Sequence, residues 1–197
     1  MPAAPVELLG DSSSALYWPR AFSAGDSDRL LDALERETEW RHEEITVAGR
    51  RVLQPRLTAW QGDPGAEYRY SGLALQPRPW GRAACEIRAV AEALAQTTFD
   101  SVLLNLYRDG HDSMGWHADD EKVLGVEPVI ASVSFGGLRR FVLRRRDDPA
   151  VRVEVEPAHG SAIVMAGRTQ HEWMHAVPKT ARAVEPRINL TFRRIRG

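Results

Sequence analysis

Hydrophobic and polar positions divide this chain into a helical first half and a second half of short strands. Leucines recur at helical spacing after Asp26, where one stripe is formed by Leu30, Leu31 and Leu34, and this pattern predicts a helix that begins at Ser23 or Asp26. A second set of small and apolar residues predicts a helix opened by Pro79 that runs to about Gln96. Both helices are expected to lie against a sheet.

Short apolar runs separated by Gly, Asp and Pro turns follow Phe99. They predict strands at Val102–Tyr107, Val129–Phe135, Arg140–Arg144, Val151–Val155, Ser161–Met165 and Ile188–Arg194. Many short strands with such turns favour an antiparallel sandwich of jelly-roll type. We therefore expect an α+β chain with a loose lead-in over residues 1–16, including a short strand near Leu8, and a single domain over residues 17–197.

Composition limits the class of protein. The 197 residues with 43% hydrophobic content suit one globular domain, and one cysteine excludes an internal disulfide. We find neither an apolar run long enough for a bilayer nor a secretory start, so the expected location is cytoplasmic, and the expected state is a monomer. With a net charge of -1, any nucleic-acid partner needs local positive charge. The candidates are Arg50–Arg51, Arg139–Arg140 and Arg144–Arg146, which are equally explained as solvated strand ends and turns.

Candidate metal ligands occur in the second half. In an extended strand His117 and Asp119 project to the same side, so both can bind one ion. A distant imidazole, from His171 or His175, completes two histidines and one carboxylate. This set leaves three positions open on one side of an octahedral ferrous ion, which suits a co-substrate and dioxygen.

The last predicted strand has two different faces. Ile188, Leu190 and Phe192 share the packing face, while the polar face carries Arg187, Asn189, Thr191 and Arg193. Two guanidiniums on one face suit an elongated dicarboxylic acid, because each can bind a carboxylate in bidentate fashion. The alternative for Arg193 is an ion pair with a nearby acid.

Five ordered blocks resemble the AlkB-type dioxygenases. They are Asn105–Tyr107, His117–Glu121, Ala131–Gly136, Trp173–Pro178 and Arg187–Arg193. The resemblance, continuous from about Gln54 to Arg194, implies a double-stranded β-helix over residues 99–195, with iron(II), 2-oxoglutarate and O2 as cofactor and co-substrates. The Trp-x-His-x-Val-Pro context implies that His175, rather than His171, is the second histidine ligand beside His117 and Asp119.

The resemblance also implies roles for other residues. Arg187 would bind the distal carboxylate of 2-oxoglutarate, with further hydrogen bonds from Asn105, Tyr107, Asn189, Thr191 and Arg193. Asn105 and Tyr107 fall on one strand face, in agreement with this role. A nucleotide-recognition lid is implied over residues 42–75, and substrate contacts are implied for Arg50, Tyr68, Tyr70, Asp120 and Glu121. Residues 45–51 alternate weakly around Gly49, which is typical of a hairpin or loop.

The implied reaction is oxidative demethylation of 1-methyladenine or 3-methylcytosine in DNA, with RNA left open, coupled to decarboxylation of 2-oxoglutarate to succinate. The family's duplex-repair members use an aromatic finger in the lid, whereas this chain has Val47-Ala48-Gly49-Arg50. This departure argues against a preference for duplexes. Two alternatives stay open: a hydroxylase of a protein or small molecule and, ranked last, a non-catalytic nucleic-acid binding module.

Overall fold

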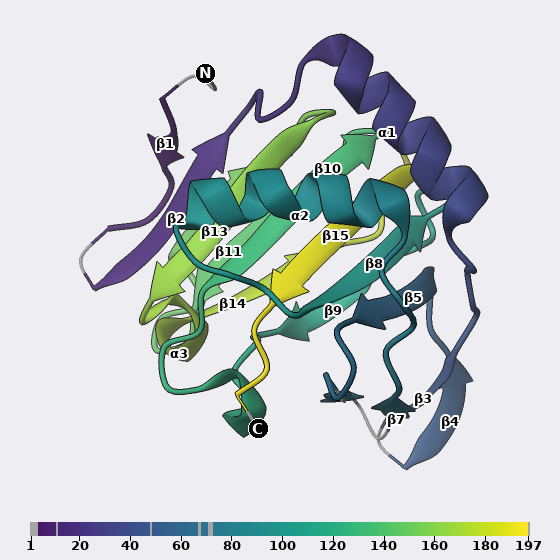
Figure 1. Ribbon diagram of the computed structural model, residues 1–197. Coiled ribbons are helices and arrows are strands. Elements are labelled where there is room, and N and C mark those ends of the chain that lie inside the picture. The colour runs from purple at the N-terminus through teal and green to yellow at the C-terminus, as the bar shows by residue number, and fades with distance from the viewer. Residues whose placement is uncertain (1–3, 11, 48, 67, 71–72, 197) are drawn as a thin grey trace.

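Two β-sheets and two long helices form the layers of the molecule (Figure 1). The computed structural model describes residues 4–10, 12–47, 49–66, 68–70 and 73–196, with the description of 47, 68–70 and 73–75 confined to the backbone. Both helices lie on the same face of the larger sheet, and the smaller sheet lies behind its other face. Most of the candidate metal and co-substrate ligands predicted from the sequence line the space between the two sheets.

The larger sheet has seven antiparallel strands in the order β1-β2-β13-β10-β15-β8-β5. Their bounds are Val6–Glu7 (β1), Ser13–Trp18 (β2), Leu57–Gly62 (β5), Ser101–Tyr107 (β8), Ile130–Gly136 (β10), Ser161–Gly167 (β13) and Arg187–Arg193 (β15). In the central register, Asn189 pairs with Asn105 on one side and with Ser134 on the other. This pairing places polar residues from three strands side by side.

The smaller sheet has four antiparallel strands in the order β12-β11-β14-β9. Their bounds are Met114–His117 (β9), Phe141–Arg145 (β11), Arg152–Val155 (β12) and Trp173–Val177 (β14). One-turn helices occur at Lys122–Leu124, in the loop after β9, and at Thr169–Glu172, directly before β14, the second labelled α3. The two sheets together form the double-stranded β-helix expected for the core.

The helices form close to the predicted positions. Helix α1 spans Ala24–Glu37, and Ser23 caps it by accepting a hydrogen bond from the backbone N–H of Asp26 at 3.1 Å. Helix α2 spans Arg82–Ala95, so the expectation that Pro79 opens it is wrong by three residues. The helix begins after Gly81, whose N–H donates to the side chain of Gln61 instead of continuing a helix backwards.

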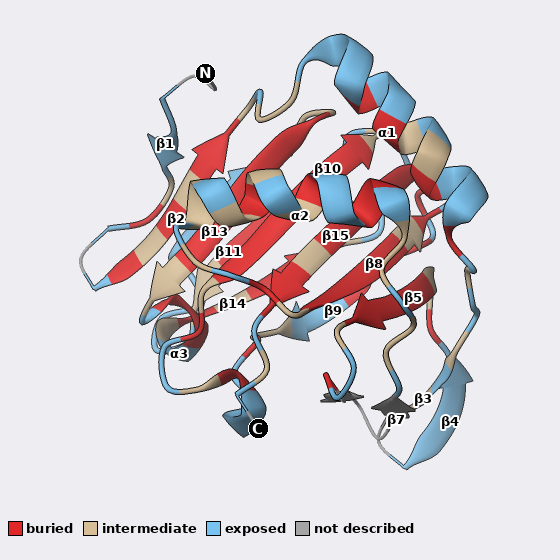
Figure 2. Cartoon of the chain, viewed as in Figure 1, coloured by how far each residue is buried: buried red, intermediate tan, exposed pale blue. Residues whose placement is uncertain are grey.

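Two apolar clusters fill the spaces between the layers. One lies between the helices and the larger sheet and includes Leu30, Ile87, Leu104, Leu190 and Phe192; the other lies between the sheets and includes Leu103, Met114, Phe141, Ile163 and Trp173. Figure 2 shows the buried strands behind the two helices, whose outer faces are exposed. Alternate residues of β8 and β15 point to opposite faces of the larger sheet. Their polar residues all lie on the face that packs against the smaller sheet.

Two boundary predictions need correction. Residues 13–16 are not part of a loose lead-in, because β2 pairs with β13 from Ser13 to Trp18 and buries alternate side chains. Within the expected lid, β5 is a strand of the larger sheet, so only the hairpins β3–β4 (Glu44–Val47 and Arg50–Leu53) and β6–β7 (Tyr68–Tyr70 and Leu73–Leu75) stand apart from it. Strand β2 was not predicted because residues 12–14 are serines, which are more typical of loops than of strands.

Candidate active site

A cavity lies between the two sheets and collects most of the predicted functional residues. Its apolar walls include Met114, Phe141 and Val177. Its polar lining consists of Asn105, Tyr107, His117, Asp119, Ser132, His175, Asn189, Thr191 and Arg193. The fold therefore brings together candidate metal ligands from β9 and β14 and candidate co-substrate ligands from β8 and β15.

His117 reaches the cavity because β9 contains a bulge. His117 pairs with His175 and Met114 pairs with Val177, so three steps along β9 match two steps along β14. The extra residue lets Met114 and His117 both face inward although they are three positions apart. The Nδ1 atom of His117 donates to the carbonyl of Gly115 at 2.9 Å. Because a carbonyl only accepts, Nε2 carries the lone pair available to a metal.

His175 comes from the neighbouring strand β14 and is buried. Its ring centroid lies 4.2 Å from that of His117 and 5.4 Å from that of Phe141. Burial lowers its pKa to about 3, and the nearby imidazole of His117 contributes to the same shift. Burial also lowers the pKa of His117. Both rings are therefore neutral at physiological pH, which is the form that binds a metal.

Asp119 is not in a strand, so the strand alternation that predicted the direction of its side chain does not apply to it. Strand β9 ends at His117, and Asp119 lies in the loop that follows. Its backbone N–H donates to the Oε1 of Gln170 at 2.9 Å. Its Oδ1 accepts from Arg193, while its buried Oδ2 has no hydrogen-bond partner and stands 3.8 Å from Nε2 of His175.

Burial alone would raise the pKa of Asp119. Attraction to Arg193, His175 and His117 outweighs this effect, and the pKa is lowered to about 2. The carboxylate is therefore charged, and one of its oxygens faces the two imidazoles. An unbonded buried carboxylate oxygen is costly unless a cation balances it.

The donor set fits a ferrous ion. Two neutral imidazoles and one carboxylate form the ligand type that holds iron(II) in oxygenases. Ligands at ~2.1 Å from an ion and at right angles are about 3 Å apart, slightly less than the 3.8 Å between His175 and Asp119. No three His, Cys, Asp or Glu side chains in the described ranges are already spaced as a formed metal site. A shift of under about 1 Å must accompany binding.

Arg187 lies behind the polar wall of the cavity and is 1% exposed. Its Nη2 donates to Ser134 at 2.8 Å and to Oδ1 of Asn189 at 3.1 Å, whereas its buried Nε and Nη1 have no hydrogen-bond partner. Burial lowers its pKa to about 10, while Tyr107 opposes this shift. Each of these two donors can bond an oxygen of an anionic ligand.

The buried charges of the described residues are unbalanced. Four arginines and two aspartates are buried: Arg56, Arg139, Arg187 and Arg193 against Asp112 and Asp119. Asp112 pairs with the more exposed Arg108. An anionic ligand such as a dicarboxylic acid would reduce this excess of buried positive charge.

Arg193 has a different partner from the one implied for it. Its Nε and Nη2 donate to Oδ1 of Asp119 at 3.2 and 2.5 Å, so it takes the alternative of an ion pair with a nearby acid. The residue still lines the cavity. It thus holds a candidate metal ligand in place while lining the cavity.

The residues implied for substrate contact do not gather at one place, unlike the candidate metal ligands. Asp120 is exposed and accepts from Arg146 at 2.6 Å, and Glu121 precedes the one-turn helix at Lys122–Leu124. Arg50 is exposed on β4, in a hairpin outside the larger sheet. The side chains of Tyr68 and Tyr70, as well as Ala48 in the finger position, lie outside the described residues.

Two other sequence expectations are resolved by the structure. His171 points away to the carbonyl of Val126 and does not line the cavity. Arg139 is buried and donates to the carbonyls of Asp109, Asp112 and Pro178, so the cluster Arg139–Arg140 is not a surface patch.

Sequence reasoning missed two buried residues beside the site. Arg56 donates from Nε to Oδ1 of Asn105 at 2.7 Å, and its buried Nη2 has no hydrogen-bond partner. Gln170 holds the backbone of Asp119. Neither residue belongs to a motif with a chemical signature, and a lone arginine or glutamine in a sequence is usually a surface residue.

Comparisons with known proteins identify the family of this chain. The family model described as the 2OG-Fe(II) oxygenase superfamily matches residues 14–193. Alpha-ketoglutarate-dependent dioxygenase alkB homolog 3 of Mus musculus is 38% identical over 94% of this chain and 67% of its own length. DNA oxidative demethylase ALKBH2 of Bos taurus is 39% identical over 94% of this chain and 75% of its own length.

A solved structure shares the fold. The structure titled "The structure of OsALKBH1" superimposes with a TM-score of 0.66 and 16% identity, covering 94% of this chain and 98% of that one. The fold and the site define an iron- and 2-oxoglutarate-dependent oxygenase. The chain belongs to the 2OG-Fe(II) oxygenase superfamily and, within it, to the AlkB-type dioxygenases.

Membership of this family makes the protein an enzyme that uses iron(II), 2-oxoglutarate and O2. None of the helices in the described part of the chain combines the length and apolar character that crossing a membrane requires.

Proposed function

We propose that this enzyme oxidatively demethylates 1-methyladenine and 3-methylcytosine in DNA. The observation that carries the proposal is that His117, Asp119 and His175 meet at one cavity, close to a guanidinium with two free donors. The relatives support a nucleobase substrate, since one of them is named a DNA oxidative demethylase. RNA remains a second substrate class to be measured.

The chain's own residues orient the reactants. His117, Asp119 and His175 would hold iron(II) on one side, and Arg187, with Asn105, Tyr107, Asn189 and Thr191, would fix the dicarboxylate beside it. The bound iron, 2-oxoglutarate and O2 supply the oxidation that removes the methyl group. Met114 and Phe141 contribute apolar walls that exclude water from the space between the sheets.

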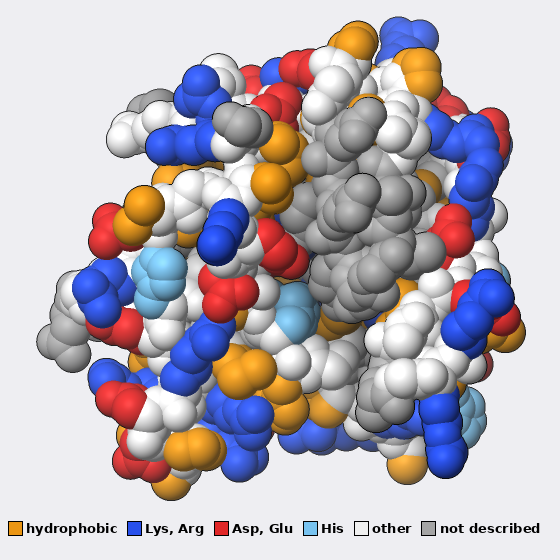
Figure 3. Space-filling view, turned by 90° about the horizontal axis from the view of Figure 1, so that it is seen from below, with side chains coloured by type: hydrophobic (Ala, Val, Ile, Leu, Met, Phe, Trp, Pro, Cys, Tyr) orange, Lys and Arg blue, Asp and Glu red, His pale blue; other side chains and the backbone are white. Residues whose placement is uncertain are grey.

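Substrate binding would use local rather than overall charge. On the face shown in Figure 3, Lys and Arg side chains lie in separate groups with acidic side chains between them. Arg50 of the β3–β4 hairpin is exposed and is the basic residue that we assign to the nucleic-acid backbone. Tyr68 and Tyr70 are proposed to stack on the methylated base, with Asp120 and Glu121 facing its polar edge.

A panel of oligonucleotides tests the function. Single- and double-stranded DNA and RNA carrying either methylated base are incubated with the protein, iron(II), ascorbate and 2-oxoglutarate. We expect the mass of the base to fall by one methyl group, most rapidly in single strands, with matching succinate release. Succinate release that ignores nucleic acid would favour the hydroxylase of a protein or small molecule. If the protein binds neither iron nor 2-oxoglutarate, the non-catalytic binding module would be favoured.

Two histidine variants provide a matched pair. His175→Ala should abolish turnover and weaken iron binding, whereas His171→Ala, which removes a ring bonded to Val126, should leave both unchanged. Loss of iron binding in His171→Ala alone would contradict the assigned ligand set. The monomeric state and the cytoplasmic location stay predictions, which gel filtration and cell fractionation test.

A further inference from the structure

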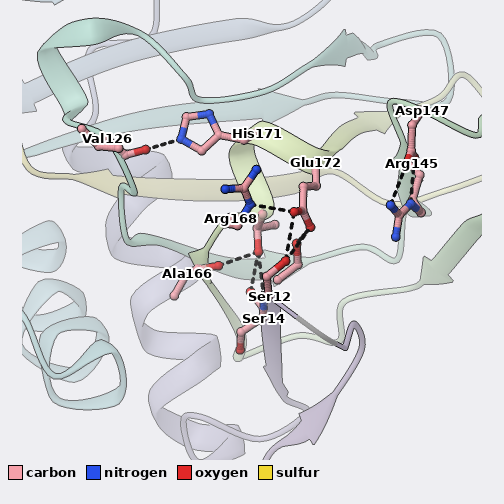
Figure 4. A network of polar contacts seen from close by, with 11 residues as sticks. Ser12, Ser14, Val126, Arg145, Asp147, Ala166, Arg168, His171 and Glu172 are labelled. Carbon is pink, nitrogen blue, oxygen red and sulfur yellow. Dashed lines mark hydrogen bonds and ion pairs between the residues drawn. The ribbon is translucent and has the colours of Figure 1, made fainter.

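Helix α3 is a single turn that hydrogen bonds attach to β2 and to the C-terminal end of β13. The hydroxyl of Thr169 shares its one proton between the carbonyls of Ser14 and Ala166, at 2.9 and 2.6 Å, and accepts from the N–H of Ser14 at 3.0 Å. Glu172 accepts from Arg168 at 2.7 Å and from the hydroxyl of Ser12 at 2.9 Å. Figure 4 shows these contacts converging on the turn. A one-turn helix held from several sides provides a rigid support.

Gln170 projects from this turn into the space between the sheets and is 0% exposed. Its Oε1 accepts from the backbone N–H of Asp119 at 2.9 Å, and its Nε2 points to the sulfur of Met165 at 3.7 Å. A thioether is a weak acceptor, so the bond to Asp119 is the stronger of the two. A buried amide oxygen holding a loop N–H fixes that loop without needing water.

A second contact joins the same loop to the same turn. The Nη2 of Arg146 donates to Oδ2 of Asp120 at 2.6 Å and to the carbonyl of Gln170 at 3.1 Å. The loop after β9 is therefore attached to α3 through its backbone at Asp119 and through the side chain of Asp120. This attachment replaces the strand pairing that ends at His117.

Asp119 is thus held both at its backbone and at its carboxylate. Gln170 fixes its backbone, and Arg193 fixes Oδ1, which leaves Oδ2 without a hydrogen bond and directed toward His175. If the backbone moved, Oδ1 could keep its bond to Arg193 while Oδ2 turned away from the imidazoles. The position of the free oxygen therefore depends on Gln170.

We propose that Gln170 is a positioning residue for the metal site, acting through the backbone of Asp119. The proposal rests on Asp119 being a metal ligand, as the proposed function assumes, but not on the identity of the substrate. Partners in the outer shell of metal ligands typically contribute 10- to 100-fold to metal affinity. Gln170 differs from most of these because it holds the main chain and not the ligating side chain.

The test compares two neighbouring substitutions on α3. Gln170→Met keeps the length of the side chain and removes the acceptor, while the control Thr169→Val loosens the turn from β2 without touching Asp119. Cobalt(II) is titrated into the metal-free proteins, and both the affinity and the visible absorption of the bound ion are recorded. Thermal unfolding monitors the fold of each variant.

We expect Gln170→Met to bind cobalt(II) about ten-fold more weakly and with a changed absorption spectrum. Thr169→Val should lower the unfolding temperature but keep the wild-type affinity and spectrum. Wild-type affinity and spectrum in Gln170→Met, or equal losses in both variants, would overturn the proposal. Failure of the wild-type protein to bind any metal would instead overturn the proposed site.

If Gln170→Met does not fold, two further measurements test the proposal. Gln170→Asn keeps the amide but shortens its reach by one methylene, and it should show the same loss of metal affinity. In the wild-type protein, the N–H of Asp119 should exchange slowly with solvent although it lies in a loop. Rapid exchange of that N–H would overturn the proposal without any variant.

Discussion

Arg193 donates from both Nε and Nη2 to a single oxygen of Asp119, Oδ1, at 3.2 and 2.5 Å. Both side chains are almost completely buried. The arrangement directs the other carboxylate oxygen, Oδ2, toward His175. An arginine that the sequence suggested as a ligand for the co-substrate thus orients the carboxylate that we propose as a metal ligand.

Replacing Arg193 should weaken metal binding. Arg193→Lys keeps the charge but removes the planar pair of donors, so the carboxylate of Asp119 gains rotational freedom. We expect iron(II) affinity to fall on the order of ten-fold, as measured by anaerobic titration calorimetry. Arg194→Lys is the control, because Arg194 is the next residue and is exposed. Unchanged affinity in Arg193→Lys would contradict this assignment.

Replacing Arg187 should affect the co-substrate instead. Arg187→Met removes the two free donors and keeps the volume approximately, and hydrogen bonds to charged groups contribute about 1.5 to 3 kcal/mol each. The KM for 2-oxoglutarate should therefore rise at least about ten-fold, while iron(II) affinity stays within about two-fold. Succinate release measured against 2-oxoglutarate concentration gives the first value. A parallel loss of metal affinity would show that Arg187 is structural.

The stability of the metal-free protein should depend on the protonation of His175. Burial is the main cause that lowers its pKa to about 3, whereas an unfolded histidine titrates near ~6.5. Between these values the unfolded state binds more protons, so the free energy of unfolding falls as the pH decreases. The slope for this one group approaches about 1.4 kcal/mol per pH unit.

Urea unfolding of the metal-free protein between about pH 7.5 and about pH 4.5 measures that slope. His175→Leu removes the group, so the difference in slope between the variant and the wild type isolates its contribution. Identical slopes would mean that His175 takes up its proton equally readily in the folded and in the unfolded state. That result would contradict its burial as a neutral ligand.

Arg56 should support the co-substrate pocket from behind. Its Nε donates to Asn105 and its Nη1 to the carbonyl of Ser113, which joins β8 to the start of β9. Arg56→Leu leaves Oδ1 of Asn105 unsatisfied, at a cost of about 1 to 3 kcal/mol of unfolding free energy. Arg41→Leu, at an exposed position beside β5, should change stability by less than about 0.5 kcal/mol. Equal stability of both variants would contradict a structural role for Arg56.

Several features followed from local pattern. The leucine stripe of α1 and the alternation in β15 predicted which faces are buried, because side chains repeat every 3.6 residues in a helix and every two in a strand. Residues Ile188, Leu190 and Phe192 are indeed in the core against the helices, and Asn189 and Thr191 line the cavity. Family resemblance added the choice of His175 over His171, which spacing alone left open.

The sequence by itself determined the elements and the kinds of side chain available for chemistry, since both depend on residues that are close together in the chain. Only the tertiary structure decided how those side chains meet. The bulge in β9 turns His117 inward, Arg193 takes one oxygen of Asp119, and Gln170 holds the loop from 51 positions away. Such contacts join residues far apart in the chain through a specific strand register, and no local period encodes that register.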